Sequence, residues 1–318
     1  ADGNGAEDIF GPWQIGEHGF PCDGYSYARG IAEAASRNNI DLDKYDQLIC
    51  ILPRVEYLGC EWTGVATSVD GHPAAFITTP AALAKVPYMY RTFFHEMLHL
   101  VGVDHANTDY NNDFDWYDAG EGEYGDKSSA MGASMHNIMN APHLLVLGAF
   151  DETPEAYQFT PRSGRYPLEV LTNDPFSATH PQILLPPRDE RAHYYLSYRE
   201  AVGVDQELWK GFQGKLSVHS GGATSMFIDT LEPGETFTDE ARHKQFQFDG
   251  YDLNGVAQVT VKMNEVLPQI VPSGMADVAV STAGNKRVLA VDTGDFDNDG
   301  DLDILVIGDR APFVLRND

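Results

Sequence analysis

The stretch HEMLHLVGVDH, which ends at His105, constrains this chain more than any other part of its sequence. It sets three histidines, a glutamate and a glycine in the spacing HExxHxxGxxH. Residues four apart on a helix share a face, so His95 and His99 would present their imidazoles side by side, with Glu96 next to them. Gly102 would let the backbone leave the helix through a conformation closed to most residues and return His105 to the same point. The pattern therefore demands a helix, a sharp turn and a third imidazole facing the first two.

Three converging imidazoles predict a zinc site. Catalytic zinc is commonly held by three protein ligands and keeps a fourth position for water, whose pKa it lowers to about 7. We predict that His95, His99 and His105 bind Zn²⁺, and that Glu96 takes a proton from the attacking water and then delivers it to the leaving amine of an amide. The alternative is an ordinary amphipathic helix with surface or core histidines. The coincidence of all the specified positions of the motif argues against it.

The motif matches the extended zinc motif of the metzincin metallopeptidases, which the chain therefore resembles. A methionine turn beneath the metal is the second hallmark of these enzymes, and SSAMGASM offers Met131 for it, with Met135 and Met139 as weaker candidates. Within the metzincins the chain is most similar to the gametolysin-like (autolysin) peptidases. The similarity lies in the phrases ILPRVEYLGCEWTGVA, HEMLHLVGVDHA, EYGDKSSAMG, NAPHLLVLGAF and HYYLSYREAVGVDQEL. It implies a secreted enzyme that acts on extracellular glycoproteins or other matrix and wall proteins.

Two departures from the family pattern limit what the resemblance implies. Some metzincins have a tyrosine two residues after the methionine of the turn, where this chain has Ala133, so no such tyrosine can be carried over. The family often has a cysteine shortly before that methionine, where this chain has Ser129. Cys60 therefore lacks the partner that the resemblance implies, and it would pair with Cys50 or Cys22 or stay free.

The EYGD segment that precedes the methionine turn carries Tyr124 and Asp126. These residues would orient the loop around Met131 or line the cleft. The alternative is a solvated loop built from turn-forming residues. The sequence leaves both interpretations open.

The order of the patterns predicts an α+β protein. Helical spacing occurs at 24–38, 90–100 and 136–150, and strand-like runs at 45–53 and 64–80. With the resemblance, this implies a metzincin-type catalytic domain with a twisted sheet and three main helices over residues 1–155. Short alternating strands then predict a β-sandwich-like domain over 156–270. A short β repeat over 271–318 would complete the chain.

The segment GDFDNDGDLD near the C-terminal end predicts a calcium site. Its carboxylates alternate along the chain with Gly300 at the turn, which suits a hard cation; they are Asp295, Asp297, Asp299, Asp301 and Asp303. An EF-hand is excluded, because its twelfth position would be Val306 instead of glutamate. The segment resembles one FG-GAP-type repeat of extracellular β-propellers. One repeat cannot close a propeller, so we expect the chain to continue past Asp318 or the repeat to dock on the β domain. An acidic turn without metal is the alternative.

The charge of the chain narrows its partners. There are 48 Asp and Glu against 21 Lys and Arg, for a net charge of −27, which disfavours nucleic acid and acidic membrane surfaces. No run of residues is apolar enough for a membrane span. The first residues lack the pattern of a signal peptide, so we expect a processed, secreted form that acts outside the cell.

The function that these features favour is a zinc metalloendopeptidase with protein or peptide substrates. One alternative is a non-catalytic extracellular binding or adhesion protein that retains a zinc fold and the calcium loop. Intact Glu96 argues against it, since a structural zinc site has no use for a base. Another alternative is a zinc hydrolase of a different amide, such as a peptidoglycan cross-link. The oligomeric state is left open.

Overall fold

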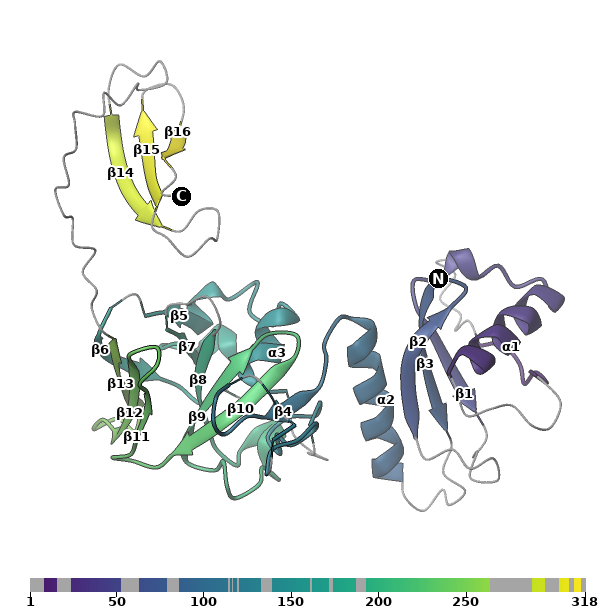
Figure 1. Ribbon diagram of the computed structural model, residues 1–318, viewed down its shortest axis with the longest axis horizontal. Helices are drawn as coiled ribbons and strands as arrows, with labels where there is room; N and C mark the ends of the chain where they lie inside the picture. Colours follow the sequence, from purple (N-terminus) through teal and green to yellow (C-terminus); the bar gives the residue numbers. More distant parts are fainter. Residues whose placement is uncertain are drawn as a thin grey trace.

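The protein, seen here in a computed structural model (Figure 1), is a mixed α+β structure that is rich in sheets and has few helices. The structure describes residues 9–15, 24–52, 63–78, 86–113, 115, 117–118, 120–132, 139–160, 162–171, 174–186, 193–263, 288–294, 303–308 and 312–315. Its α-helices in these ranges are α1 (Gly24–Arg37), α2 (Val86–Leu100) and α3 (Ala141–Val146). Short 3₁₀ turns lie at Leu42–Lys44, Pro154–Ala156, Pro175–Ser177 and Gly203–Asp205. Among the described helices, none has the length and apolar character that crossing a bilayer requires.

A three-stranded sheet with a helix on each face forms the first part of the fold. Its strands are β1 (Leu48–Leu52), β2 (Gly64–Val69) and β3 (His72–Thr78), in the order β1-β3-β2. The central strand β3 runs parallel to β1 and antiparallel to β2. Side chains alternate along a strand, so Ala74 and Phe76 pack on the α1 side, in one core cluster with Tyr27 and Ala28. Helix α2 contacts β2 and β3 from the other face (Figure 1).

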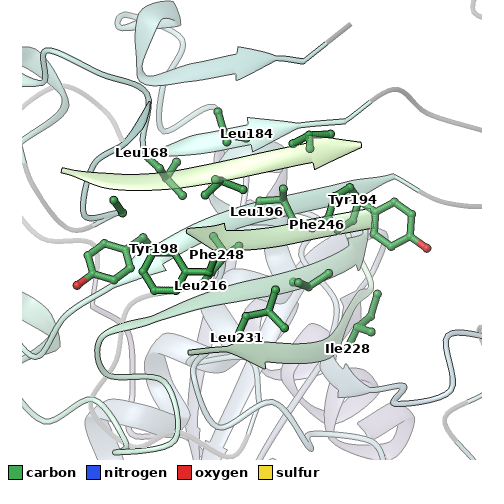
Figure 2. Close-up of a cluster of buried hydrophobic side chains, with 14 residues drawn as sticks. Leu168, Leu184, Tyr194, Leu196, Tyr198, Leu216, Ile228, Leu231, Phe246 and Phe248 are labelled. Atoms are coloured by element: carbon green, nitrogen blue, oxygen red, sulfur yellow. The ribbon is translucent and has the colours of Figure 1, made fainter. Parts of the chain in front are cut away.

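Two further sheets share the largest hydrophobic core. The six-stranded sheet has the order β4-β10-β9-β8-β7-β5 and the four-stranded sheet the order β11-β12-β13-β6. Figure 2 shows the buried side chains between them, with Leu196 and Leu216 from one sheet and Phe246 and Phe248 from the other. The strands are β4 (Ala106–Thr108), β5 (Tyr157–Phe159), β6 (Gly164–Leu168), β7 (Ile183–Leu185), β8 (Tyr194–Arg199), β9 (Lys215–Gly221), β10 (Ser225–Leu231), β11 (Thr236–Asp239), β12 (Lys244–Tyr251) and β13 (Ala257–Met263).

Strand β4 joins the two parts of the fold. It follows α2 directly in sequence, yet it pairs in parallel with β10, so that Ala106 lies opposite Ser225. Residues 106–108 thus belong to a sheet whose other strands all follow residue 155. The domain boundary that the sequence places near 155 stays a prediction, but the backbone hydrogen bonds of β4 cross it.

The last sheet is a three-stranded antiparallel one, formed by β14 (Val288–Gly294), β15 (Asp303–Gly308) and β16 (Pro312–Leu315). The calcium-site prediction falls almost entirely outside the described residues. Of its residues only Asp303 has a described backbone, as the first residue of β15; Asp295, Asp297, Asp299 and Asp301 lie outside the described residues. Calcium binding and the FG-GAP resemblance therefore stay predictions.

Helix α3 is shorter than the pattern at 136–150 predicts. It begins after Asn140, whose side chain accepts a hydrogen bond from the N–H of His143 at 3.2 Å. Asn140 is thus the N-cap that sets the first residue of the helix. It ends before Gly148, which has φ +69°. Residues 133–138 lie outside the described ranges.

His143 is a fully buried titratable group at the start of α3. Burial lowers its pKa to about 4, although the charge of Asp126 opposes the shift. The folded protein thus holds a neutral imidazole, whereas the unfolded chain takes up a proton below its ordinary pKa of 6.5. Because the unfolded state binds more protons between pH 6.5 and 4, the stability of the fold decreases as the pH falls through this window.

Because of His143, we expect the free energy of unfolding to decrease by about 2 kcal/mol as the pH falls from 7 to 5. A His143→Leu variant should lose that part of the pH dependence, which urea unfolding at several pH values would measure. His193→Leu, at an exposed histidine, is the control and should keep the slope of the parent. Equal slopes in the parent and in His143→Leu would contradict the assignment.

Candidate metal centre

Helix α2 supplies two of the three motif histidines and ends in a turn that directs the chain toward the third. The rings of His95 and His99 lie 4.8 Å apart between centroids. Beyond the helix, the N–H of Gly102 donates to the carbonyl of His99 and the N–H of Val103 to that of Leu98, both at 3.1 Å. These two bonds form a Schellman motif, with Gly102 at φ +86°. A Cβ at Gly102 would meet nothing within 4 Å, so glycine is needed there for its backbone angle and not for space.

The second half of the chain holds His105 in place. The N–H of Asp104 donates to the carbonyl of Ala223 at 2.9 Å, and the N–H of Ser225 donates to the carbonyl of His105 at 3.2 Å. The hydroxyl of Thr224 donates to the Asp104 carboxylate at 2.8 Å. Strand β4 starts at Ala106, the residue after His105. His105 is therefore fixed where β4 meets β10, and the third imidazole depends on a strand more than a hundred residues away in sequence.

Each of the three imidazoles contacts an oxygen acceptor through Nδ1. The acceptors are the Ala130 carbonyl for His95 (3.1 Å), the Val103 carbonyl for His99 (2.8 Å) and the Glu123 carboxylate for His105 (2.6 Å). An oxygen acceptor at Nδ1 requires the proton there, which leaves Nε2 as the lone-pair atom. Burial also lowers the pKa of His99, which favours its neutral form. All three rings are thus set to coordinate through Nε2.

The donor set fits a zinc ion. The potential ligand atoms of the three histidines lie within 4.8 Å of one another. The Nε2 atoms of His99 and His105 are 3.1 Å apart, close to the separation of about 3.3 Å that tetrahedral ligands at Zn–N distances of about 2.0–2.1 Å would have. Two lone pairs that face each other at such a distance repel unless a cation lies between them. The arrangement is therefore the one expected of a three-histidine metal site.

Glu96 lies beside the histidines under the edge of the first sheet. It is buried, and burial raises its pKa to about 7, while a hydrogen bond from the backbone of Ala66 opposes the shift. Gly64 makes room for it: a Cβ at Gly64 would lie 2.6 Å from the Glu96 Oε1 and 2.6 Å from the Thr92 methyl carbon. Strand β2 thus passes directly over the carboxylate, and only glycine permits that approach.

An open cleft of about 350 Å³ contains these groups. Its walls are the edge strand β2, the three histidines and the loop after β4, through residues Gly64, Val65, Ala66, His95, Glu96, His99, His105 and Tyr124. Of the EYGD segment, Tyr124 therefore lines the cleft. Burial, together with the nearby charges of Glu123 and Glu96, raises its pKa to about 12, so its hydroxyl keeps its proton.

Met131 is fully buried in a cluster with Leu98, Val103 and Met139. Its carbonyl accepts a hydrogen bond from the N–H of Ala106 at 2.9 Å. Ala130, the residue before Met131, supplies the carbonyl that contacts His95. The loop around Met131 thus contacts both His95 and the start of β4. Met139 is buried in the same cluster, and Met135 lies outside the described residues.

Asp126 fastens this loop to the rest of the protein. It is fully buried, and its carboxylate accepts hydrogen bonds from the N–H of Ser128 (2.7 Å) and the side-chain amide of Asn140 (2.9 Å), and contacts His219 Nε2 on β9 (3.1 Å). Burial raises the pKa of Asp126, but these contacts outweigh burial and lower it to about 2. The carboxylate is therefore charged and orients the loop around Met131, whereas Tyr124 two residues earlier lines the cleft.

Arg199 on β8 holds the same loop from another side. Its guanidinium donates to the carbonyl of Ser128 at 2.5 Å and to the carboxylate of Asp205 at 2.7 Å, and both ionic side chains are fully buried. The ion pair and the hydrogen bond to Ser128 offset part of the cost of removing both charges from water. The loop around Met131 is thus tied to β8 and β9 of the six-stranded sheet.

Sequence reasoning missed three contributors to the site. Glu123 is one acidic residue among many in its loop, and neither Arg199 nor His219 lies near the motif in sequence. Only the glycine of GVATSV, where a strand-like run begins with a residue that lacks a side chain, hinted at the close approach of β2. Cys50 is a free, partly buried thiol in β1; Cys22 and Cys60 lie outside the described residues.

The contact between Glu123 and His105 gives a test of the metal site. A carboxylate that orients a histidine ligand typically strengthens metal binding, and its removal weakens affinity about 10–100-fold. We expect Glu123→Ala to show this loss for zinc, measured by competition with a chromogenic chelator. Glu155→Ala removes an exposed acid elsewhere on the chain and should bind zinc like the parent. An unchanged affinity in Glu123→Ala would contradict the role of this contact.

Comparison with known proteins identifies the family of the chain. The family model described as gametolysin peptidase M11 matches residues 21–251, which is well over half of the chain. No curated protein and no solved structure gives a significant match. The matched span contains the three histidines, Glu96, the loop around Met131 and the strands that hold them. The chain therefore belongs to the gametolysin peptidase M11 family, a family of metallopeptidases.

Proposed function

We propose that this protein is a secreted zinc metalloendopeptidase of the metzincin type, with His95, His99 and His105 as zinc ligands and Glu96 as general base and acid. The observation that carries the proposal is the convergence of three Nε2-directed imidazoles, with ligand atoms within 4.8 Å, beside a buried glutamate in an open cleft. Zinc bound there supplies a Lewis acid and lowers the pKa of a water to about 7.

Glu96 is the only carboxylate that lines the described part of the cleft. In the proposed reaction it accepts a proton from the water whose oxygen forms a bond with the carbonyl carbon of the substrate. The C–N bond then breaks, and the same proton passes from Glu96 to the leaving nitrogen, so the glutamate ends as it began. Its confinement beneath Gly64 holds the carboxylate at one place throughout both transfers.

Strand β2 offers a surface for an extended peptide. It is the edge of its sheet in the order β1-β3-β2, and Gly64, Val65 and Ala66 line the cleft. An edge strand presents N–H and C=O groups to one side, and a peptide that adds to it places alternate side chains toward and away from the cleft. This supports cleavage within extended segments of protein chains.

The remaining parts of the proposal rest on charge and on the resemblance of the sequence. A net charge of −27 favours substrates rich in Lys and Arg and suits a soluble extracellular enzyme. Extracellular glycoproteins or other matrix and wall proteins are the substrates that the resemblance implies. The calcium-binding FG-GAP-like repeat over 271–318 is proposed on sequence alone.

Glu96→Gln tests the chemistry most directly, because it keeps the shape of the side chain and removes its basicity. General acid–base catalysis contributes about 10²–10⁴-fold, and we expect hydrolysis of denatured casein to fall by at least the lower of these factors. Zinc content, measured in parallel, should be the same in both proteins. Gln14→Glu, a reverse exchange in the N-terminal segment outside the cleft, is a control and should cleave like the parent.

The outcomes separate the proposed functions. Zinc in both proteins and cleavage by the parent alone would support the peptidase mechanism. Zinc in both proteins and cleavage by neither would contradict the proposed activity and favour a non-catalytic binding protein. Equal cleavage by both would contradict the role of Glu96.

Gly64→Ala tests whether the approach of β2 positions the base. The added methyl would meet the Glu96 carboxylate and the Thr92 methyl at 2.6 Å, so one of them must move. Because small displacements of a catalytic group cost about 10²-fold, we expect kcat to fall by about that factor while zinc binding is retained. Gly222→Ala is the matched control, since a Cβ there meets nothing within 4 Å. Equal kcat values for the two variants would contradict the prediction.

A further inference from the structure

We infer that Tyr124 is a second catalytic residue, whose hydroxyl donates a hydrogen bond to the carbonyl oxygen of the bond being cleaved. This inference rests on the proposed peptidase function and deepens it. It assigns a role to a cleft residue that the zinc motif does not include.

The ring of Tyr124 lies against the metal ligands. Its centroid is 4.0 Å from that of His105 and 5.8 Å from that of His95, at interplanar angles of 41° and 34°. It lines the same cleft as Glu96 and Gly64, with 39% of its surface exposed. Tyr124 thus forms a wall of the space in which a scissile bond must lie to reach both the histidines and Glu96.

The backbone holds the ring there against its own preference. Tyr124 has φ +63°, a left-handed conformation that is unfavourable for a bulky residue. Its N–H donates to the side-chain oxygen of Asn107 at 3.2 Å, and Asn107 is a buried residue of β4. The neighbouring Glu123 is held by His105. Backbone strain of this kind persists only where surrounding contacts impose it, and here they direct an aromatic ring into the cleft.

The hydroxyl of Tyr124 is available for substrate. Among the described residues, the hydrogen bonds assigned to Tyr124 involve its backbone and not its phenol oxygen. By contrast, the buried hydroxyls of Tyr194 and Tyr195 each contact a protein acceptor. A phenol is protonated at neutral pH, so it can donate.

A hydrogen-bond donor at this position would stabilise the negative charge that develops on the carbonyl oxygen. When the oxygen of water bonds to the carbonyl carbon, the carbonyl π electrons move to its oxygen, which gains negative charge. A fixed hydrogen-bond donor stabilises that charge more than the neutral carbonyl and so lowers the barrier. Glu96 cannot serve here, because it is a proton acceptor at that moment. Tyr124 donates without losing its proton, so the transfers assigned to Glu96 are unchanged.

Tyr124→Phe is the test, because it keeps the ring against His105 and removes only the hydroxyl. The substrate is an internally quenched peptide built around a bond that the parent cleaves in denatured casein. Removing one such donor costs about 10²–10³-fold in kcat. We expect a fall in that range, with KM changed by no more than about 2-fold. Tyr25→Phe, at an exposed tyrosine of α1, should match the parent.

Binding of a phosphinic peptide gives a readout that does not depend on turnover. Its tetrahedral, negatively charged group imitates the transition state, so Tyr124→Phe should bind it more weakly by about the factor lost in kcat. Affinity for the cleaved product peptides and zinc content should not change.

The outcomes are distinct. A kcat in Tyr124→Phe equal to that of the parent would overturn the inference and leave the proposed function standing. Loss of zinc in Tyr124→Phe would also overturn it, since the residue would then act only on the metal site. A parent protein that cleaves no casein would contradict the proposed function and the inference together.

Discussion

The convergence of three imidazoles at one point is the constraint on which the rest of this structure depends. A helix alone can align only two of them, because the next residues on the same face, seven or eight positions on, lie about 10–12 Å farther along the axis. The third must come from chain outside the helix, and it must be fixed as firmly as the first two. The Schellman turn at Gly102 lets the chain leave the helix, and the junction of β4 with β10 fixes the position of His105. The five specified positions of the motif thus describe a helix, its end and the start of a strand.

The orientation of the rings depends on a second set of contacts that lies below and beside them. Ala130, Val103 and Glu123 accept at Nδ1 and so direct each Nε2 toward the common point. Two of these acceptors are backbone carbonyls, and their positions are only as fixed as the loops that carry them. Buried charged groups fix the loop before Met131: Asp126 contacts β9 and Arg199 reaches from β8. Charge buried at some cost in desolvation therefore keeps this loop, and with it the Ala130 carbonyl that contacts His95, in place.

The sequence predicted the local parts of this site well and the distant parts poorly. A spacing of four, a glycine after a helix and an alternation of apolar residues are local signals, and helix α1, helix α2 and most strands of the large sheets follow them. Strand β4 has only three residues and pairs with β10, so nothing near it in sequence reveals its partner. The roles of Glu123 and Arg199 cannot be predicted from the sequence either, because they arise from contacts across the fold. The pattern at 136–150 predicts a longer helix than α3, because the apolar run hides the capping effect of Asn140, after which the helix begins.

The family match covers strands far along the chain that hold the candidate site, as well as the motif itself. The zinc motif ends at His105, but the site it builds needs β10 to hold His105, β9 and β8 to hold the loop around Met131, and β12 to complete the core against which those strands pack. Strand β12 ends at Tyr251, which is also the last residue of the match. The matched span therefore contains the strands whose hydrogen bonds hold the candidate site, while β13, which packs in the same core, lies beyond it. The large β core acts as the frame of the candidate site as much as a domain that follows it.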